Sequence, residues 1–135
     1  MAEFKPQELA NTAWAFATLG QLDAQLFTAL ARKAEHGVGN FNPQNLANTA
    51  WAFATAGQPD AQLFMVLARA AERRVGDFNP QELANTAWAF AMLGQADVQL
   101  FMALAREAEC RLGDFNPQNL ANTAWAFAML GQADV

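Results

Sequence analysis

Side chains capable of covalent or acid–base chemistry are few in this sequence. It contains one histidine, His36, one cysteine, Cys110, and no tyrosine or serine. An enzyme needs a nucleophile, an acid–base pair or a metal cluster, and neither His36 nor Cys110 has a second ligand at metal-binding spacing. The eight glycines lie at or beside expected helix ends, so none belongs to a phosphate-binding loop. We therefore expect a non-enzymatic protein, without a cofactor or metal, whose function lies in a surface.

The polar side chains that could form such a surface recur at a fixed interval of 37 residues. The segment LANTAWAFA occurs at 9–17, 46–54, 83–91 and 120–128. Three complete copies and a partial fourth one cover residues 4–40, 41–77, 78–114 and 115–135. Tandem copies of this length indicate a repeat protein, in which each unit buries its apolar face against the next. We interpret 1–135 as a single helical-repeat domain.

Each copy contains the start and stop signals of two helices. In the third copy, Asn79 is a suitable N-cap, Pro80 suits the first helical position and Glu82 can complete a capping box. Gly94 suits a left-handed cap at the end of this helix, and Asp97 then caps a second one. A connection of about three or four residues makes the two helices antiparallel neighbours. We therefore predict an all-α fold, an α-solenoid of antiparallel helix hairpins with about seven helices.

Projected at about 100° per residue, the first helix of a copy has a wide apolar arc and a polar arc. In the first copy the apolar arc contains Leu9, Ala10, Ala13, Trp14, Phe16 and Ala17. The polar arc contains Gln7, Glu8, Asn11, Ala15 and Thr18. We expect the tryptophans to pack between helices, because small alanines beside a large ring suit a close-packed interface. The alternative interpretation is that the rings are platforms on which nucleic-acid bases stack.

The polar arc of the first helix is the candidate binding surface, because one row of helices commonly lines the concave groove of a solenoid. Asparagine is mildly unfavourable inside a helix, so its recurrence indicates either ligand contact or a ladder of amides bonded between copies. The hydroxyl of Thr12, at the edge of the apolar arc, should bond back to the carbonyl one turn earlier. Two positions vary between copies, as code positions of RNA-reading repeats do. The ligand-binding candidates are Gln7, Glu8, Asn11, Thr18, Gln44, Asn45, Asn48, Thr55, Gln81, Glu82, Asn85, Met92, Gln118, Asn119, Asn122 and Met129.

Arginines recur in the second helix of each copy, and three of them precede a glutamate by three residues. This spacing is typical of an exposed helical ion pair, which stabilises a helix by only about a few tenths of a kcal/mol. The alternative is a row of phosphate contacts. The candidates for such contacts are Arg32, Arg69, Arg73, Arg74 and Arg106.

Charge restricts the partner of this surface. The chain has a net charge of −5, and the helices expected at 43–56 and 117–130 contain no charged residue. Binding of RNA draws much of its affinity from phosphate neutralisation, so an uncharged arc also suits a protein or peptide partner. A third interpretation is a consensus-like or fragmentary array without a partner of its own.

Hydropathy and the ends of the chain lead to three further expectations. No apolar run is long enough to span a membrane, and the first residues lack the pattern of a targeting segment. Arrays of this type normally need polar capping repeats, which this chain lacks at both ends. The outermost helices should therefore expose apolar surface, which predicts end-to-end self-association.

A family resemblance adds to this interpretation. The segment PQELANTAWAFATLG has a Trp-Ala pair and a closing Leu-Gly, and a second helix containing LFxxLAR follows it. It resembles the octotricopeptide repeat family and the related repeats found beside RAP domains, over essentially the whole chain. The resemblance implies sequence-specific binding of single-stranded RNA in chloroplasts or mitochondria, with roles in RNA stability, processing or translation. The contacts that it implies come from Gln7, Glu8, Asn11 and Thr18 and their equivalents in the later copies.

Overall fold

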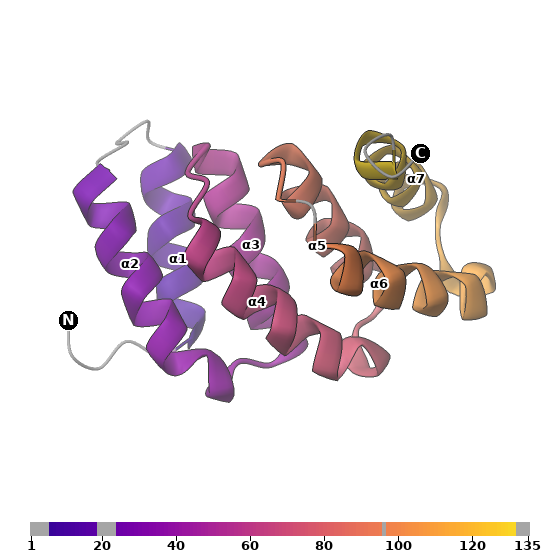
Figure 1. The fold of residues 1–135 in the computed structure, drawn as a ribbon, viewed down its shortest axis with the longest axis horizontal. Coiled ribbons are helices and arrows are strands. Elements are labelled where there is room, and N and C mark those ends of the chain that lie inside the picture. Colours follow the sequence, from indigo (N-terminus) through magenta and orange to yellow (C-terminus); the bar gives the residue numbers. More distant parts are fainter. Residues whose placement is uncertain (1–5, 19–23, 96, 132–135) are drawn as a thin grey trace.

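The computed structural model describes residues 6–18, 24–95 and 97–131, and these ranges contain helices and no strand. The seven α-helices are α1 (Pro6–Thr18), α2 (Ala24–Gly37), α3 (Pro43–Ala56), α4 (Ala61–Arg74), α5 (Pro80–Met92), α6 (Val98–Cys110) and α7 (Pro117–Gly131). Short 3₁₀ turns precede three of them, at Val38–Asn40, Val75–Asp77 and Leu112–Asp114. Figure 1 shows the odd-numbered helices in one layer and the even-numbered helices in the other. The predicted all-α helical-repeat fold is confirmed.

Capping residues set the boundaries of these helices. The side chain of Asn79 accepts a hydrogen bond from the Glu82 backbone N–H at 2.7 Å, and the Glu82 carboxylate accepts one from the Asn79 N–H at 2.9 Å. Gly94, just beyond the end of α5, has a φ of 66°. Asp97 accepts a hydrogen bond from the Leu100 N–H at 2.9 Å at the start of α6. These interactions confirm the predicted caps and satisfy N–H groups that the first helical turn leaves without partners.

Successive odd-numbered helices make the most extensive contacts in the fold, α1 with α3, α3 with α5 and α5 with α7. One flank of each helix faces the preceding helix of this row. In α1, which has no described helix before it, Thr12 and Ala15 are partly exposed. Their equivalents in α3, Thr49 and Ala52, are buried. The flank that faces the preceding helix is therefore formed by threonine and alanine.

The opposite flank, which faces the next odd-numbered helix, consists of alanines. In α7, which no described helix follows, Ala124 and Ala128 are exposed, whereas their equivalents Ala50 and Ala54 in α3 are buried. We call the contact between two such flanks the alanine–threonine seam. Because the spacing of packed helices depends on the side chains between them, these small residues let the helix axes approach closely.

The seam also determines how the stack curves. The even-numbered helices approach one another less closely than the odd-numbered helices do. In a stack of helix hairpins, the more closely spaced row lies on the inner side of the curve. We therefore expect the odd-numbered helices to line the concave side, and this curvature stays a prediction.

Phenylalanine pairs join each even-numbered helix to the odd-numbered helix of the next copy. The rings of Phe27 in α2 and Phe53 in α3 meet edge-to-face with centroids 5.6 Å apart. The equivalent pair of α4 and α5, Phe64 with Phe90, has a separation of 4.8 Å, and the pair of α6 and α7 has one of 5.7 Å. Edge-to-face pairs contribute about 0.5–1.5 kcal/mol beyond the burial of their area. The same contact therefore closes three successive interfaces between copies.

Ion pairs join the even-numbered helices to one another. Arg32 in α2 donates hydrogen bonds to Asp60, the N-cap of α4, at 2.6 Å, and to the side chain of Gln62 at 2.6 Å. Arg69 in α4 makes the same pair of contacts with Asp97 and Gln99. Each of these aspartates therefore caps its own helix and also binds the arginine of the preceding copy.

The threonines of the seam differ from the sequence prediction in their hydrogen bonding. Three buried threonine side-chain oxygens make no hydrogen bond to any described residue, those of Thr49, Thr86 and Thr123. The expected bond to the carbonyl one turn earlier is therefore wrong for these three. Their place is set by packing, since a threonine fits between the alanines of neighbouring helices.

None of the described helices is long and apolar enough to cross a membrane.

We expect Ala89→Leu, within the seam between α3 and α5, to lower the free energy of unfolding by about 1–3 kcal/mol. Ala89 is fully buried, and a larger side chain there must push the two helices apart. Urea denaturation followed by circular dichroism measures the loss. Ala61→Leu, at an exposed position of α4, is the matched control. Equal stability of the two variants would contradict the close packing of the seam.

Asp97→Ala should destabilise the chain by about 1–3 kcal/mol, because it removes both the N-cap of α6 and the partner of Arg69. Asp97→Asn keeps an acceptor for the Leu100 N–H and removes only the charge, so its cost should be below about 1 kcal/mol. Thermal unfolding of both variants, with the exposed Asp114→Ala as control, measures this order. If Asp97→Asn were as unstable as Asp97→Ala, the N-cap hydrogen bond would contribute less to stability than the ion pair with Arg69.

The exposed flank of α7 supports the predicted end-to-end association, which stays a prediction. Its alanines have the same spacing as the alanines through which α3 packs against α5. The exposed flank of α1 in a second molecule can therefore pack there. Sedimentation velocity at rising concentration should detect oligomers, and Ala124→Glu should reduce them by placing an unpaired charge in the contact. Ala61→Glu is the control. A wild-type chain that stays monomeric at every concentration would overturn the prediction.

Candidate functional site

Packing on three sides leaves α3 and α5 one narrow exposed stripe each, and α1 and α7 carry the same residues at the equivalent positions. In α3, Gln44, Asn48 and Thr55 are exposed and Trp51 is partly exposed. These residues are spaced by four, three and four positions, so they lie on one line along the helix. We call the surface formed by these stripes the odd-helix face. Its described side chains are Asn11, Trp14, Gln44, Asn48, Trp51, Thr55, Gln81, Asn85, Trp88, Met92, Gln118, Asn122, Trp125 and Met129.

The two remaining candidates of this stripe, Gln7 and Thr18 in α1, have side chains that lie outside the described residues. The repeat period assigns them to the same two columns as Gln44 and Thr55.

The exposure of two tryptophans contradicts the prediction that these rings pack between helices. Trp14 is 50% exposed and Trp125 is 39% exposed, so the expected packing of these rings between helices is wrong. Conversely, Ala15 was expected on the polar arc, yet its equivalents Ala52 and Ala89 are fully buried. The physical reason is the seam, because helices in close contact through alanine leave no space for an indole ring between them. Trp14 and Trp125 are therefore exposed on the stripe, whereas Trp51 and Trp88 are half-buried there and Trp88 also packs against the core.

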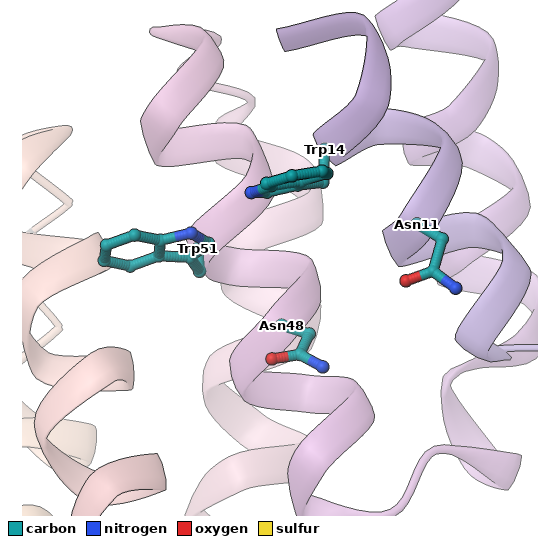
Figure 2. Close-up of a pocket in the computed structure, with 4 residues that line it drawn as sticks. All are labelled: Asn11, Trp14, Asn48 and Trp51. Carbon is teal, nitrogen blue, oxygen red and sulfur yellow. The ribbon is translucent and has the colours of Figure 1, made fainter. Parts of the chain in front are cut away.

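A pocket lies between the stripes of α1 and α3. It is lined by Asn11, Trp14, Asn48 and Trp51 and has a volume of about 240 Å³. Figure 2 shows the Trp14 ring reaching from α1 across the gap toward α3, with the two asparagine amides below it. Two aromatic rings and two amides thus border one open space.

The next gap along the row has a different geometry. The rings of Trp51 and Trp88 are in contact, with centroids 4.4 Å apart and planes inclined by 35°. Trp51 therefore lines the pocket toward α1 and contacts Trp88 toward α5. The sequence predicted neither the pocket nor the ring contact. The spacing of Trp14 places it in line with Gln7, Asn11 and Thr18, which indicates a shared column but not the distances between helices.

The asparagine amides of the odd-helix face have free hydrogen-bonding capacity. Asn11 and Asn48 are exposed, and Asn85 and Asn122 are partly exposed. No hydrogen bond joins these amides to one another or to any other group in the part of the chain that the structure describes. Each amide can therefore both donate to and accept from a ligand.

The position that alternates between glutamate and asparagine takes part in helix capping. The side chain of Asn45 accepts a hydrogen bond from the Asn42 N–H at 3.0 Å, and that of Asn119 accepts one from the Asn116 N–H at 3.3 Å. Glu82 does the same in the third copy. Glutamate and asparagine both supply the acceptor that a capping box needs, which explains the alternation without a ligand.

The arginines lie on the even-numbered helices, away from the pocket. Arg32 pairs with Glu35 at 2.9 Å and Arg69 with Glu72 at 3.5 Å, so the expected helical ion pairs are confirmed in two copies. Arg106 forms no such pair with Glu109. Both paired arginines also bind the aspartate of the next copy, as described above.

Two further arginines lie near the end of α4. Arg74 donates a hydrogen bond to the Phe41 carbonyl at 2.7 Å, which ties the end of α4 to the start of its own copy. Arg73 is exposed and makes no ion pair with a described residue. The structure thus brings the glutamines, asparagines and tryptophans together and leaves the arginines apart from them.

The family model of RNA-editing substrate-binding complex 6 protein matches residues 1–134. No curated protein matches the chain. The matching family is an RNA-associated helical one, and the match does not single out the octotricopeptide repeats. Because the match covers almost the entire sequence, the chain belongs to the RNA-editing substrate-binding complex 6 protein family.

Proposed function

We propose that the chain is a non-enzymatic module that binds single-stranded RNA on its odd-helix face. The observation that carries the proposal is the pocket between α1 and α3, where two tryptophan rings and two unpaired amides meet. Aromatic rings offer platforms to unstacked bases, and each stacked base contributes about 1–3 kcal/mol. Amides can bond the edges of those bases. The family name refers to a substrate-binding complex of RNA editing, which supports RNA as the partner.

Binding of this kind depends on stacking and on amide hydrogen bonds rather than on phosphate neutralisation. The stripes of α3 and α7 carry no charged residue, and the net charge of the chain is −5. The salt dependence of RNA binding scales with the number of phosphates that cations neutralise. With that number close to zero, we expect the affinity to change less than about threefold between roughly 50 and 200 mM salt.

The proposed contact residues are the glutamines, the asparagines, the tryptophans and the threonine-or-methionine column of the odd-helix face. This is the mode that resemblance to octotricopeptide repeats implies, with contacts from the first helix of each copy. We leave out the alternating position of Glu82 because its side chain acts in capping. We also leave out Arg32 and Arg69, because aspartates and glutamates already neutralise them. Arg73 and Arg106 are exposed on even-numbered helices and do not border this face.

A second candidate function is a protein-interaction scaffold that uses the same face. The observation that favours it is the uncharged stripe on an acidic chain, since most RNA-binding surfaces are basic. Exposed tryptophan and methionine side chains, such as Trp14 and Met92, are also common at protein interfaces.

The test of RNA binding is fluorescence anisotropy of labelled, mixed-sequence single-stranded RNA. We expect the Asn48→Ala, Asn85→Ala double variant to bind roughly tenfold or more weakly than the wild type, because bidentate amide contacts with bases contribute about 1–3 kcal/mol each. Asn40→Ala, an exposed asparagine outside the odd-helix face, is the matched control and should bind like the wild type.

Two results would contradict the proposal. The first is equal affinity of the double variant and the wild type, which would remove the asparagines from the interface. The second is absence of RNA binding at roughly 150 mM salt, where repulsion between the acidic chain and RNA is largely screened, and this result would favour the protein-scaffold function.

A further inference from the structure

The gaps between successive tryptophans are not equivalent. Between Trp14 and Trp51 an open pocket of about 240 Å³ separates the two stripes. Between Trp51 and Trp88 the rings already touch, at a centroid distance of 4.4 Å. The first gap offers open space beside an exposed indole ring, whereas the second gap accepts a flat ring only after the two indoles separate. A strand on the odd-helix face therefore meets one site that is ready for insertion.

We propose that this pocket is an insertion site for a single adenine base of a bound RNA strand. The inference rests on the proposed function and adds to it the position and the identity of one base. The base stacks on the indole rings of Trp14 and Trp51, and the amide of Asn11 or Asn48 bonds its edge. Trp88 is a positioning residue, because its contact with Trp51 supports the platform from the other side.

The chemistry of the lining favours adenine. An amide bonds any base edge that presents a donor beside an acceptor, which adenine, uracil and cytosine all do, so the amides hold the base and stacking selects it. Guanine is most often read through its N7 and O6 acceptors, for which arginine or lysine is the usual partner. No cationic side chain is among the residues that line the pocket. A purine also covers more of two indole rings than a pyrimidine does, so uracil and cytosine should bind more weakly.

The lining also explains why one base is held rather than a run of them. The contact between Trp51 and Trp88 closes the gap between α3 and α5. Of the two gaps that the residues of the pocket border, the one between α1 and α3 is open. Neighbouring nucleotides then lie along the exposed glutamine and threonine columns, where no ring is available on both sides. Adenine at one position of the strand should therefore matter more than adenine elsewhere.

The experiment uses the full chain and short single-stranded oligonucleotides. Oligoadenylate carrying one 2-aminopurine, a fluorescent adenine analogue whose emission falls on stacking, reports insertion directly. We expect quenching on addition of the chain, and affinity for oligoadenylate at least about fivefold above that for oligouridylate. Trp14→Ala should lower the oligoadenylate affinity about tenfold and remove most of the quenching.

Met65→Ala is the matched control, because Met65 is an exposed apolar side chain on α4, outside the odd-helix face. It should change the affinity less than about threefold. Asn48→Ala provides a second variant, which should lower the affinity for oligoadenylate because Asn48 lines the pocket. Far-UV circular dichroism of each variant checks that the helices are retained.

The outcomes separate the two proposals. If no oligonucleotide binds, the proposed RNA-binding function is overturned, and the insertion site with it. If RNA binds but oligoadenylate and oligouridylate bind equally, and Trp14→Ala and Met65→Ala behave alike, RNA binding stands and the insertion site is wrong. Preference for oligoadenylate, with an affinity that Trp14→Ala and Asn48→Ala lower and Met65→Ala does not, supports the site.

Discussion

The fold and the candidate site both depend on the alanine–threonine seam between successive odd-numbered helices. Small residues on both flanks bring α1, α3, α5 and α7 into the most extensive contacts of the chain. Phenylalanine pairs tie the even-numbered helices to this row, and arginine–aspartate pairs tie the even-numbered helices to one another. Both kinds of contact repeat from copy to copy. Because every interface uses the same contacts, the stack forms by repetition of one interaction rather than around one central core.

The seam also determines what the protein exposes. A helix that is covered on both flanks and by its even-numbered partner has only one free line of side chains, and glutamine, asparagine and tryptophan occupy it. Close spacing of the helices then brings tryptophans of neighbouring copies near one another, in contact between α3 and α5 and around a pocket between α1 and α3. An uncharged row of rings and amides follows from packing, and this row is the basis of the proposed RNA-binding function.

The sequence predicts the helices well and the site in part. Asn79, Glu82 and Asp97 act through bonds with nearby backbone groups, so their positions alone reveal the helix boundaries. The exposure of Trp14 could not be obtained in this way, because a projection of one helix does not show how many neighbours cover it. The ring contact and the pocket depend on distances between helices, and these distances follow from packing of alanines in different copies. The asparagine row, in contrast, could be recognised from its recurrence.

The central claim, that the seam holds Trp51 and Trp88 in contact, is tested most directly by exciton-coupled circular dichroism of the indole rings. The wild-type spectrum should contain a couplet from Trp51 and Trp88, whose centroids are 4.4 Å apart. Trp88→Phe should remove that couplet, and Trp125→Phe should leave it in place. A wild-type spectrum without a couplet, or one that Trp88→Phe does not change, would contradict the claim.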